Sequence, residues 1–190
     1  MKDLLDMSFR VLIKTAPQAN SERCRVLRQQ CALEFLGLVK MNKRLISIDE
    51  TWLDSGDYRR RAWKPRGLNN SIPVRKVEPR ITLVVALDNH GRIYASLLQA
   101  NSNQETMALF MRQLVQTLDC EDKNWRQNTV LVWDGAGYHT CQHMKTFLRE
   151  QQVPMMTLGP YSYLMAPAEL LFAALKMKKL NLDDVPLGKK

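Results

Sequence analysis

The chain has 190 residues, a length that suits one domain of ordinary size or one domain with a short appendage. Hydrophobic residues make up 45% and charged residues 25%, both near the average for globular proteins, which argues against a disordered or membrane-embedded class. The excess of 28 Lys and Arg over 19 Asp and Glu gives a net charge of +9, which favours a polyanionic partner but indicates no chemistry.

Targeting signals are absent from the sequence pattern. No apolar run approaches the roughly 18–20 residues of a membrane span, and the residues after Met1 lack the features of a signal peptide. We therefore expect an intracellular protein with no membrane association, in the nucleus of a eukaryote or in the cytoplasm and nucleoid of a bacterium. The four cysteines form no C-x-x-C pair, so reduced thiols are expected.

Two helices are predicted before the first strand. Residues 4–14 have a short helical pattern that ends before Pro17 and resembles an appendage. Asn20 or Ser21 can cap a second helix by accepting a bond from a free backbone N–H. The predicted buried stripe of this helix consists of Cys24, Leu27, Cys31, Phe35 and Leu38.

Short apolar runs predict strands in the rest of the chain. The expected elements are strands at 45–48, 81–87 and 92–98, a helix capped by Asn103, a strand at 129–133, a helix at 141–150, a strand at 153–158 and a helix at 168–179. The second and third strands form a hairpin around the turn at 88–91. Mixed strands interleaved with helices indicate an α/β sheet that is covered on its faces.

Three acidic residues stand where strands end or a helix begins. Asp49 and Asp134 follow apolar strands, and Glu169 opens the last helix. If the first and fourth strands are parallel neighbours, the two aspartates lie side by side and the helix acid can close the site. Clustered carboxylates repel one another unless a cation compensates, and Mg²⁺ prefers oxygen ligands. Taken singly, each acid has an ordinary structural explanation, as a turn former or a partner of the helix dipole.

The other acids are less suitable. Glu50 adjoins Asp49, but successive strand side chains point to opposite faces, so Asp49 is the candidate. The remaining acids in turn-like or terminal stretches, expected to be solvated, are Asp54, Asp57, Asp88, Asp183 and Asp184. The glycine turn at 135–137 lacks the features of a nucleotide-binding loop, and His143 with Cys141 lacks the second ligand pair of a zinc site.

A basic segment at 58–77 surrounds Trp63 and is predicted to be a ribbon and loop. It either contacts DNA phosphates or forms a solvated charged loop. Its candidate DNA-binding residues are Arg59, Arg60, Arg61, Lys64, Arg66, Arg75 and Lys76.

Four segments carry a family resemblance. Residues 48–52 are Ile-Asp-Glu-Thr-Trp, residues 63–67 are Trp-Lys-Pro-Arg-Gly, residues 133–140 are Trp-Asp-Gly-Ala-Gly-Tyr-His-Thr, and residues 160–169 are Pro-Tyr-Ser-Tyr-Leu-Met-Ala-Pro-Ala-Glu. In this order, with 34 residues between the second and third acids, they resemble the motifs of the mariner-like DDE transposases. The resemblance covers roughly residues 20–180.

The resemblance implies an RNase H-like, or retroviral-integrase-like, fold: a mixed five-stranded sheet flanked by helices. It implies a remnant of a helix-turn-helix region and linker at 1–19 and a DDE catalytic domain at 20–190. Asp49, Asp134 and Glu169 would be the catalytic residues and would hold two Mg²⁺ or Mn²⁺ ions. His139 would orient phosphate or a metal-bound water, or else pack and cap the turn.

The implied reaction is hydrolysis of DNA phosphodiesters at transposon ends, followed by strand transfer into target DNA. The expected partners are double-stranded DNA and further copies of the chain, in a homodimer or a higher synaptic complex.

This sequence departs from the family pattern at four positions. Gly135 stands where relatives have Asn, Tyr163 where they have Pro, Ala166 where they have Asn, and Ala168 where they have a larger apolar residue. Altered surroundings of ligands can weaken metal binding or activity by about 10–100-fold. An alternative is therefore a domesticated or truncated protein that binds DNA or partner chains without cutting. A second alternative is a nuclease of the same fold with another substrate.

Overall fold

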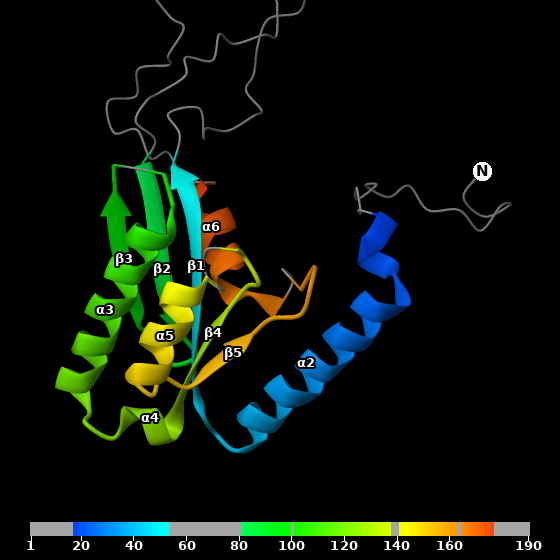
Figure 1. Ribbon diagram of the computed structural model, residues 1–190, viewed down its shortest axis with the longest axis horizontal. Coiled ribbons are helices and arrows are strands. Elements are labelled where there is room, and N and C mark those ends of the chain that lie inside the picture. Colours follow the sequence, from blue (N-terminus) through cyan, green and yellow to red (C-terminus); the bar gives the residue numbers. More distant parts are fainter. Residues whose placement is uncertain (1–16, 54–80, 100, 138–140, 163–164, 177–190) are drawn as a thin grey trace, which may run out of the picture.

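The computed structural model describes residues 17–53, 81–99, 101–137, 141–162 and 165–176. The elements in chain order are η1 (Pro17–Asn20), α2 (Glu22–Lys40), β1 (Arg44–Leu53), β2 (Ile81–Asp88), β3 (Ile93–Leu98), α3 (Gln104–Glu121), α4 (Trp125–Asn128), β4 (Thr129–Trp133), α5 (Gln142–Glu150), β5 (Met155–Thr157) and α6 (Pro167–Lys176). Figure 1 shows their arrangement. The predicted order of strands and helices is confirmed, with the short helix α4 in addition. The predictions for residues 4–14 and 58–77 lie outside the described residues.

The five strands form one mixed sheet in the order β3-β2-β1-β4-β5. β2 runs antiparallel to both β1 and β3, whereas β4 runs parallel to both β1 and β5. Arg44 lies opposite Thr129 and Ser47 lies opposite Val132. The first and fourth strands are therefore parallel neighbours, as the proposed acid site requires.

Helices cover both faces of the sheet (Figure 1). On one face α3, α4 and α5 enclose the largest buried cluster, around Met111, Leu118 and Met144. On the other face α6 packs over β1 and β2, and α2 packs over β4 and β5. Within the described ranges, no helix combines the length and apolarity needed to cross a membrane.

Helix caps follow the predicted side-chain chemistry. The Ser21 side chain accepts a bond from the Cys24 N–H, so Ser21 rather than Asn20 caps α2. Asn103 caps α3 with a reciprocal pair of bonds to Thr106.

Two local predictions were wrong. The first strand was expected to end at Ile48, but β1 continues to Leu53 because residues 46–53 all pair with β2. Sheet pairing here outweighs the low strand preference of the polar residues. Leu27 was expected in the core but is 39% exposed. A Cβ at Gly159 would lie 3.2 Å from the Leu27 carbonyl oxygen, so at this point the backbone of Leu27 faces the loop.

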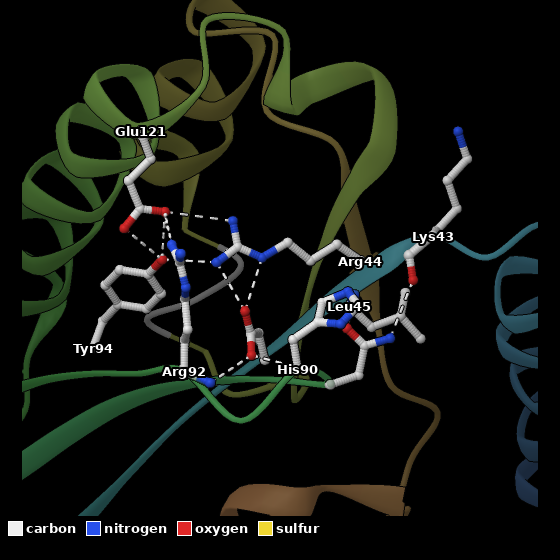
Figure 2. Close-up of polar contacts among 9 residues, drawn as sticks. Lys43, Arg44, Leu45, His90, Arg92, Tyr94 and Glu121 are labelled. Atoms are coloured by element: carbon white, nitrogen blue, oxygen red, sulfur yellow. Dashed lines mark hydrogen bonds and ion pairs between the residues drawn. The ribbon is translucent and has the colours of Figure 1, made fainter.

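The expectation that Asp88 is solvated was also wrong. Its side chain is fully buried and forms a salt bridge with Arg44 at 2.8 Å. The other carboxylate oxygen accepts bonds from the backbone N–H groups of His90 and Arg92. Arg44 also donates to the hydroxyl of Tyr94 at 2.7 Å, and that hydroxyl donates to Glu121 (Figure 2). The turn residue thus anchors the start of β1 to the β2–β3 hairpin and the end of α3.

The surroundings of Asp88 keep it charged. Burial alone would raise the pKa of Asp88, but the backbone N–H groups of Arg92 and His90 and the Arg44 guanidinium outweigh burial and lower it below its ordinary value. This contribution to stability is present above the unfolded-state pKa and is lost as the pH falls through the folded-state value.

We expect Asp88→Ala to lower the free energy of unfolding at pH 7 by about 2–4 kcal/mol, because it leaves the Arg44 charge and two turn N–H groups without their acceptor. Urea unfolding followed by circular dichroism measures the change. Glu150→Ala removes an exposed acid and should change stability by less than about 0.5 kcal/mol. Equal stability of Asp88→Ala and wild type would contradict this role.

Candidate active site

Asp49 lies within β1, and Asp134 is the first residue after the neighbouring strand β4. The β1–β4 register pairs Ser47 with Val132, and its extension by two residues along each strand brings Asp134 opposite Asp49. Neighbouring strands lie about 4.8 Å apart, so this register favours proximity of the two carboxylates. Asp49 is half-buried and Asp134 is exposed.

The face on which Asp49 lies follows from its partner on β2. Asp49 pairs with Val85, which packs against Ala168 and Phe172 of α6. Glu50 pairs with Val84, which belongs to the cluster on the α3 and α5 side. Side chains of directly paired residues share a face, so Asp49 lies on the α6 side and Glu50 on the other, as the alternation predicted.

Glu169 lies in the first turn of α6, next to the fully buried Ala168. Ala168 and Phe172 hold the helix against β1 and β2, and the Glu169 side chain is exposed. Its backbone N–H donates to the Ala166 carbonyl at 3.1 Å. The start of α6 therefore brings the third acid to the face of the sheet that carries Asp49.

The electrostatics of Asp49 reflect this arrangement. Burial raises the pKa of Asp49 to about 7, the Glu50 N–H opposes the rise by donating to the carboxylate at 2.8 Å, and the negative charges of Glu169, Glu50 and Asp134 add to it. Asp49 thus lies within electrostatic reach of both other predicted acids.

The acids do not converge on a single point. Across the described ranges, no three His, Cys, Asp or Glu side chains come close enough together to hold one metal ion. The donor set nevertheless suits a hard divalent cation, because every candidate ligand is a carboxylate oxygen and the charged form of Asp49 is disfavoured by burial and then by its acidic neighbours.

The turn after β4 is held by local bonds. One carboxylate oxygen of Asp134 accepts from the Ala136 N–H at 3.0 Å, and the indole N–H of Trp133 donates to the Thr157 hydroxyl at 3.2 Å. The nearest atom to a side chain added at Gly135 would be the Thr157 methyl group at 4.0 Å, so the missing asparagine leaves open space. His139 lies outside the described residues, as do the predicted DNA-binding residues Arg59, Arg60, Arg61, Lys64, Arg66, Arg75 and Lys76.

The loop before α6 is fixed by contacts that the sequence did not reveal. The Gly159 N–H donates to the Cys31 sulfur at 3.3 Å, and a Cβ at Gly159 would lie 3.2 Å from both the Arg28 Cα and the Leu27 carbonyl oxygen. The Arg28 guanidinium donates to the Ala19 carbonyl and, at 3.5 Å, to the Pro160 carbonyl. A glycine after a strand predicts only a turn, and no local pattern indicates that it faces a helix.

We expect Gly159→Ala to destabilise the protein by about 1–3 kcal/mol, because the added methyl group forces the loop away from the α2 backbone. Thermal unfolding measures the change. The control, Gly37→Ala, lies in α2 with open space around it and should stabilise the helix by up to about 1 kcal/mol. A neutral Gly159→Ala would show that the close approach imposes no constraint.

We expect Asp49→Asn to raise the free energy of unfolding by about 1–3 kcal/mol at pH 8 in EDTA, since it removes a charge that the fold disfavours; the range allows for the solvent that reaches this half-buried group. The folded-state pKa of about 7 exceeds the ordinary value of 3.8, so the wild type should lose stability as the pH rises from 4 to 7. Thermal melts across this range test both statements. A wild type whose stability rises over the same range, or an Asn variant less stable than it at pH 8, would contradict them.

Comparisons with known proteins agree with the fold. The chain is similar to Mos1 transposase in a paired-end complex with the left transposon end, at 19% identity and a TM-score of 0.70 over 93% of this chain and 56% of that one. It is also similar to the catalytic domain of Mos1 mariner transposase, at 19% identity and a TM-score of 0.61 over 85% of this chain and 74% of that one. The chain thus spans little more than half of the longer Mos1 chain. A comparison with curated protein sequences gave no match.

The likeness to Mos1 establishes an RNase H-like fold with a mixed five-stranded sheet flanked by helices. A family model described as DDE superfamily endonuclease matches residues 44–185, which include all three candidate acids. The match extends over most of the sequence, and the chain belongs to the DDE superfamily endonucleases.

Proposed function

We propose that this chain is the catalytic domain of a mariner-like DNA transposase, which hydrolyses phosphodiesters at transposon ends and transfers the strand into target DNA. One observation carries the proposal. Asp49 lies half-buried on the α6 side of the sheet, beside the strand that leads to Asp134, and the charges of Glu169 and Asp134 add to the rise in its pKa that burial causes.

The three acids would hold two Mg²⁺ or Mn²⁺ ions. Asp49 and Asp134 would offer oxygens from adjacent strands, and Glu169 would complete the set from the first turn of α6. When bound, such a pair of ions activates the attacking oxygen and stabilises the leaving one. Structures of the Mos1 catalytic domain with Mg and with Mn support the choice of ions.

The fold would hold Asp49 in position and would limit the access of water to it. Asp49 pairs with Val85 of β2, which restricts its backbone, and α6 packs over the face on which it lies. Water would attack a phosphodiester at the transposon end, and the freed 3′ hydroxyl would then attack target DNA. Catalytic groups that the fold holds in position lower the activation barrier, because the entropy of orienting them is lost during folding and not during the reaction.

Double-stranded DNA is the proposed partner. The net charge of +9 and the basic residues between Arg59 and Lys76 suit contact with phosphates. Mos1 is known in complexes with transposon ends, which supports a homodimer or a higher synaptic complex here. The role of His139, the division into segments 1–19 and 20–190 and the intracellular location remain predictions.

A second candidate is a domesticated or truncated protein that binds DNA or partner chains without cutting. The observation in its favour is that no three acids among the described residues are placed to hold one ion. The replacements at Gly135 and Ala166 point the same way.

We expect the wild type to nick supercoiled plasmid DNA in the presence of Mg²⁺ or Mn²⁺, and Asp134→Asn to reduce the nicking rate at least about 100-fold, because a ligand of the proposed ions is lost. Gel electrophoresis of the nicked circles measures the rate, with Glu150→Gln as an exposed-acid control. Calorimetric titration with Mn²⁺ should show weaker binding to the Asn variant.

The outcomes separate the candidates. Equal nicking by the wild type and Asp134→Asn would remove the transposase assignment. DNA binding that needs no metal, without nicking under any condition, would favour the second candidate.

A further inference from the structure

α2 carries an exposed stripe with regular spacing. Val26, Leu33 and Leu36 are 45%, 64% and 53% exposed, which is unusual for three large apolar side chains on one helix. With three exposed polar residues they form a series that we call the α2 stripe: Glu22, Val26, Gln29, Leu33, Leu36 and Lys40. The intervals alternate between four and three residues, as in the contact seam of a coiled coil.

The α2 stripe lies opposite the side by which α2 packs on its own sheet. That inner side consists of Cys31, Phe35 and Leu38, which contact β4, β5 and the loop before α6. In Figure 1, α2 (blue) stands at the border of the molecule, and its outer side faces none of the other described elements. The stripe is therefore placed to meet another molecule.

The order of side chains in the stripe identifies the partner. The stripe is acidic at its start, basic at its end and apolar on both sides of Gln29. If a second α2 lies antiparallel across a twofold axis, Glu22 meets Lys40 of the partner subunit. Val26 then meets Leu36 of the partner subunit, and Gln29 meets Leu33 of the partner subunit. All six positions match in one register, which is the self-complementarity that a twofold interface requires.

We propose that two copies of this chain associate through antiparallel pairing of their α2 stripes. A parallel pair would place like charges together at both ends, which disfavours that orientation. The polar Gln29 near the centre would fix the register, as single polar residues do in coiled-coil seams. The space around Gly37 is open, so the two helices can approach closely there.

The interface is small. The stripe spans 18 residue steps, or about 27 Å of helix, and such a seam is shorter than the contacts of permanent dimers. Pairing through α2 would be a reversible contact that a shared DNA substrate strengthens. The proposal names a surface for the homodimer in the proposed function, but its test measures association alone and does not depend on cleavage.

Sedimentation equilibrium of the full chain without DNA tests the proposal. The wild type should show a concentration-dependent monomer–dimer equilibrium, and Leu33→Glu should raise its dissociation constant at least about tenfold by placing a charge in the apolar part of the seam. Leu109→Glu is the matched control, because Leu109 is 52% exposed on α3, away from the stripe, and the variant should dimerise like the wild type.

A charge exchange tests the antiparallel register and avoids any change to the apolar side chains. Glu22→Lys and Lys40→Glu should each weaken dimerisation, whereas the double variant should restore it to within about threefold of the wild type. In a parallel pair, residues 22 and 40 would each face the same residue of the partner subunit. The single variants would then exchange one like-charge contact for another, and the double variant would show no recovery of dimerisation.

Three results would overturn the proposal. The first is a wild type that stays monomeric at every concentration, as it would if another part of the same chain covers the α2 stripe. The second is a Leu33→Glu variant that dimerises like the wild type. The third is a Glu22→Lys, Lys40→Glu double variant that shows no recovery of dimerisation. Circular dichroism of each variant establishes that a loss of association does not come from unfolding.

Discussion

The parallel pairing of β1 with β4 is the constraint on which the rest of the candidate site depends. Side chains on a strand alternate between faces, so a slip of one residue in this register would send Asp134 to the α3 and α5 side of the sheet. The slip is opposed by buried apolar groups on both faces, since Leu131 belongs to one core cluster and Val132 to another. The position of the acids is thus determined by the packing of their apolar neighbours.

The start and the middle of β1 have opposite electrostatic character. At Arg44 the strand begins in a network in which each charge faces an opposite charge, and this network stabilises the fold. At Asp49 the strand carries a half-buried carboxylate whose charged form is disfavoured first by burial and then by the charges of nearby acids, which costs stability in the absence of a cation. Such an exchange of stability for reactivity is common where proteins bind metals or substrates. The anchored start of β1 helps to hold the strand that the half-buried Asp49 weakens.

Local patterns in the sequence predicted most of the fold, because the five strands are clear apolar runs and α2 and α3 begin at residues with capping side chains. The condition that the first and fourth strands are parallel neighbours was confirmed, although Asp49 lies within β1 and does not follow its end. Local patterns failed where tertiary contacts decide the outcome. The burial of Asp88 depends on Arg44, which is 44 residues distant, and the close approach of Gly159 to α2 depends on a helix 128 residues earlier. For Glu169, the sequence predicted its place at the start of a helix, but only the packing of Ala168 and Phe172 indicates which face of the sheet it reaches.

The sheet order also has a consequence for synthesis on the ribosome. Arg44 and its partner Thr129 are separated by about 85 residues, so the central strand leaves the ribosome well before the strand that completes its second edge. At typical elongation rates of about 5–20 residues per second, this edge of β1 remains open for roughly 4–17 s. During that time β1 can pair only with the β2–β3 hairpin, and the buried residues Ile46 and Ile48 lack their final neighbours. The exposed edge of β1 in the nascent chain is therefore a site at which chaperones that recognise unpaired strands can bind.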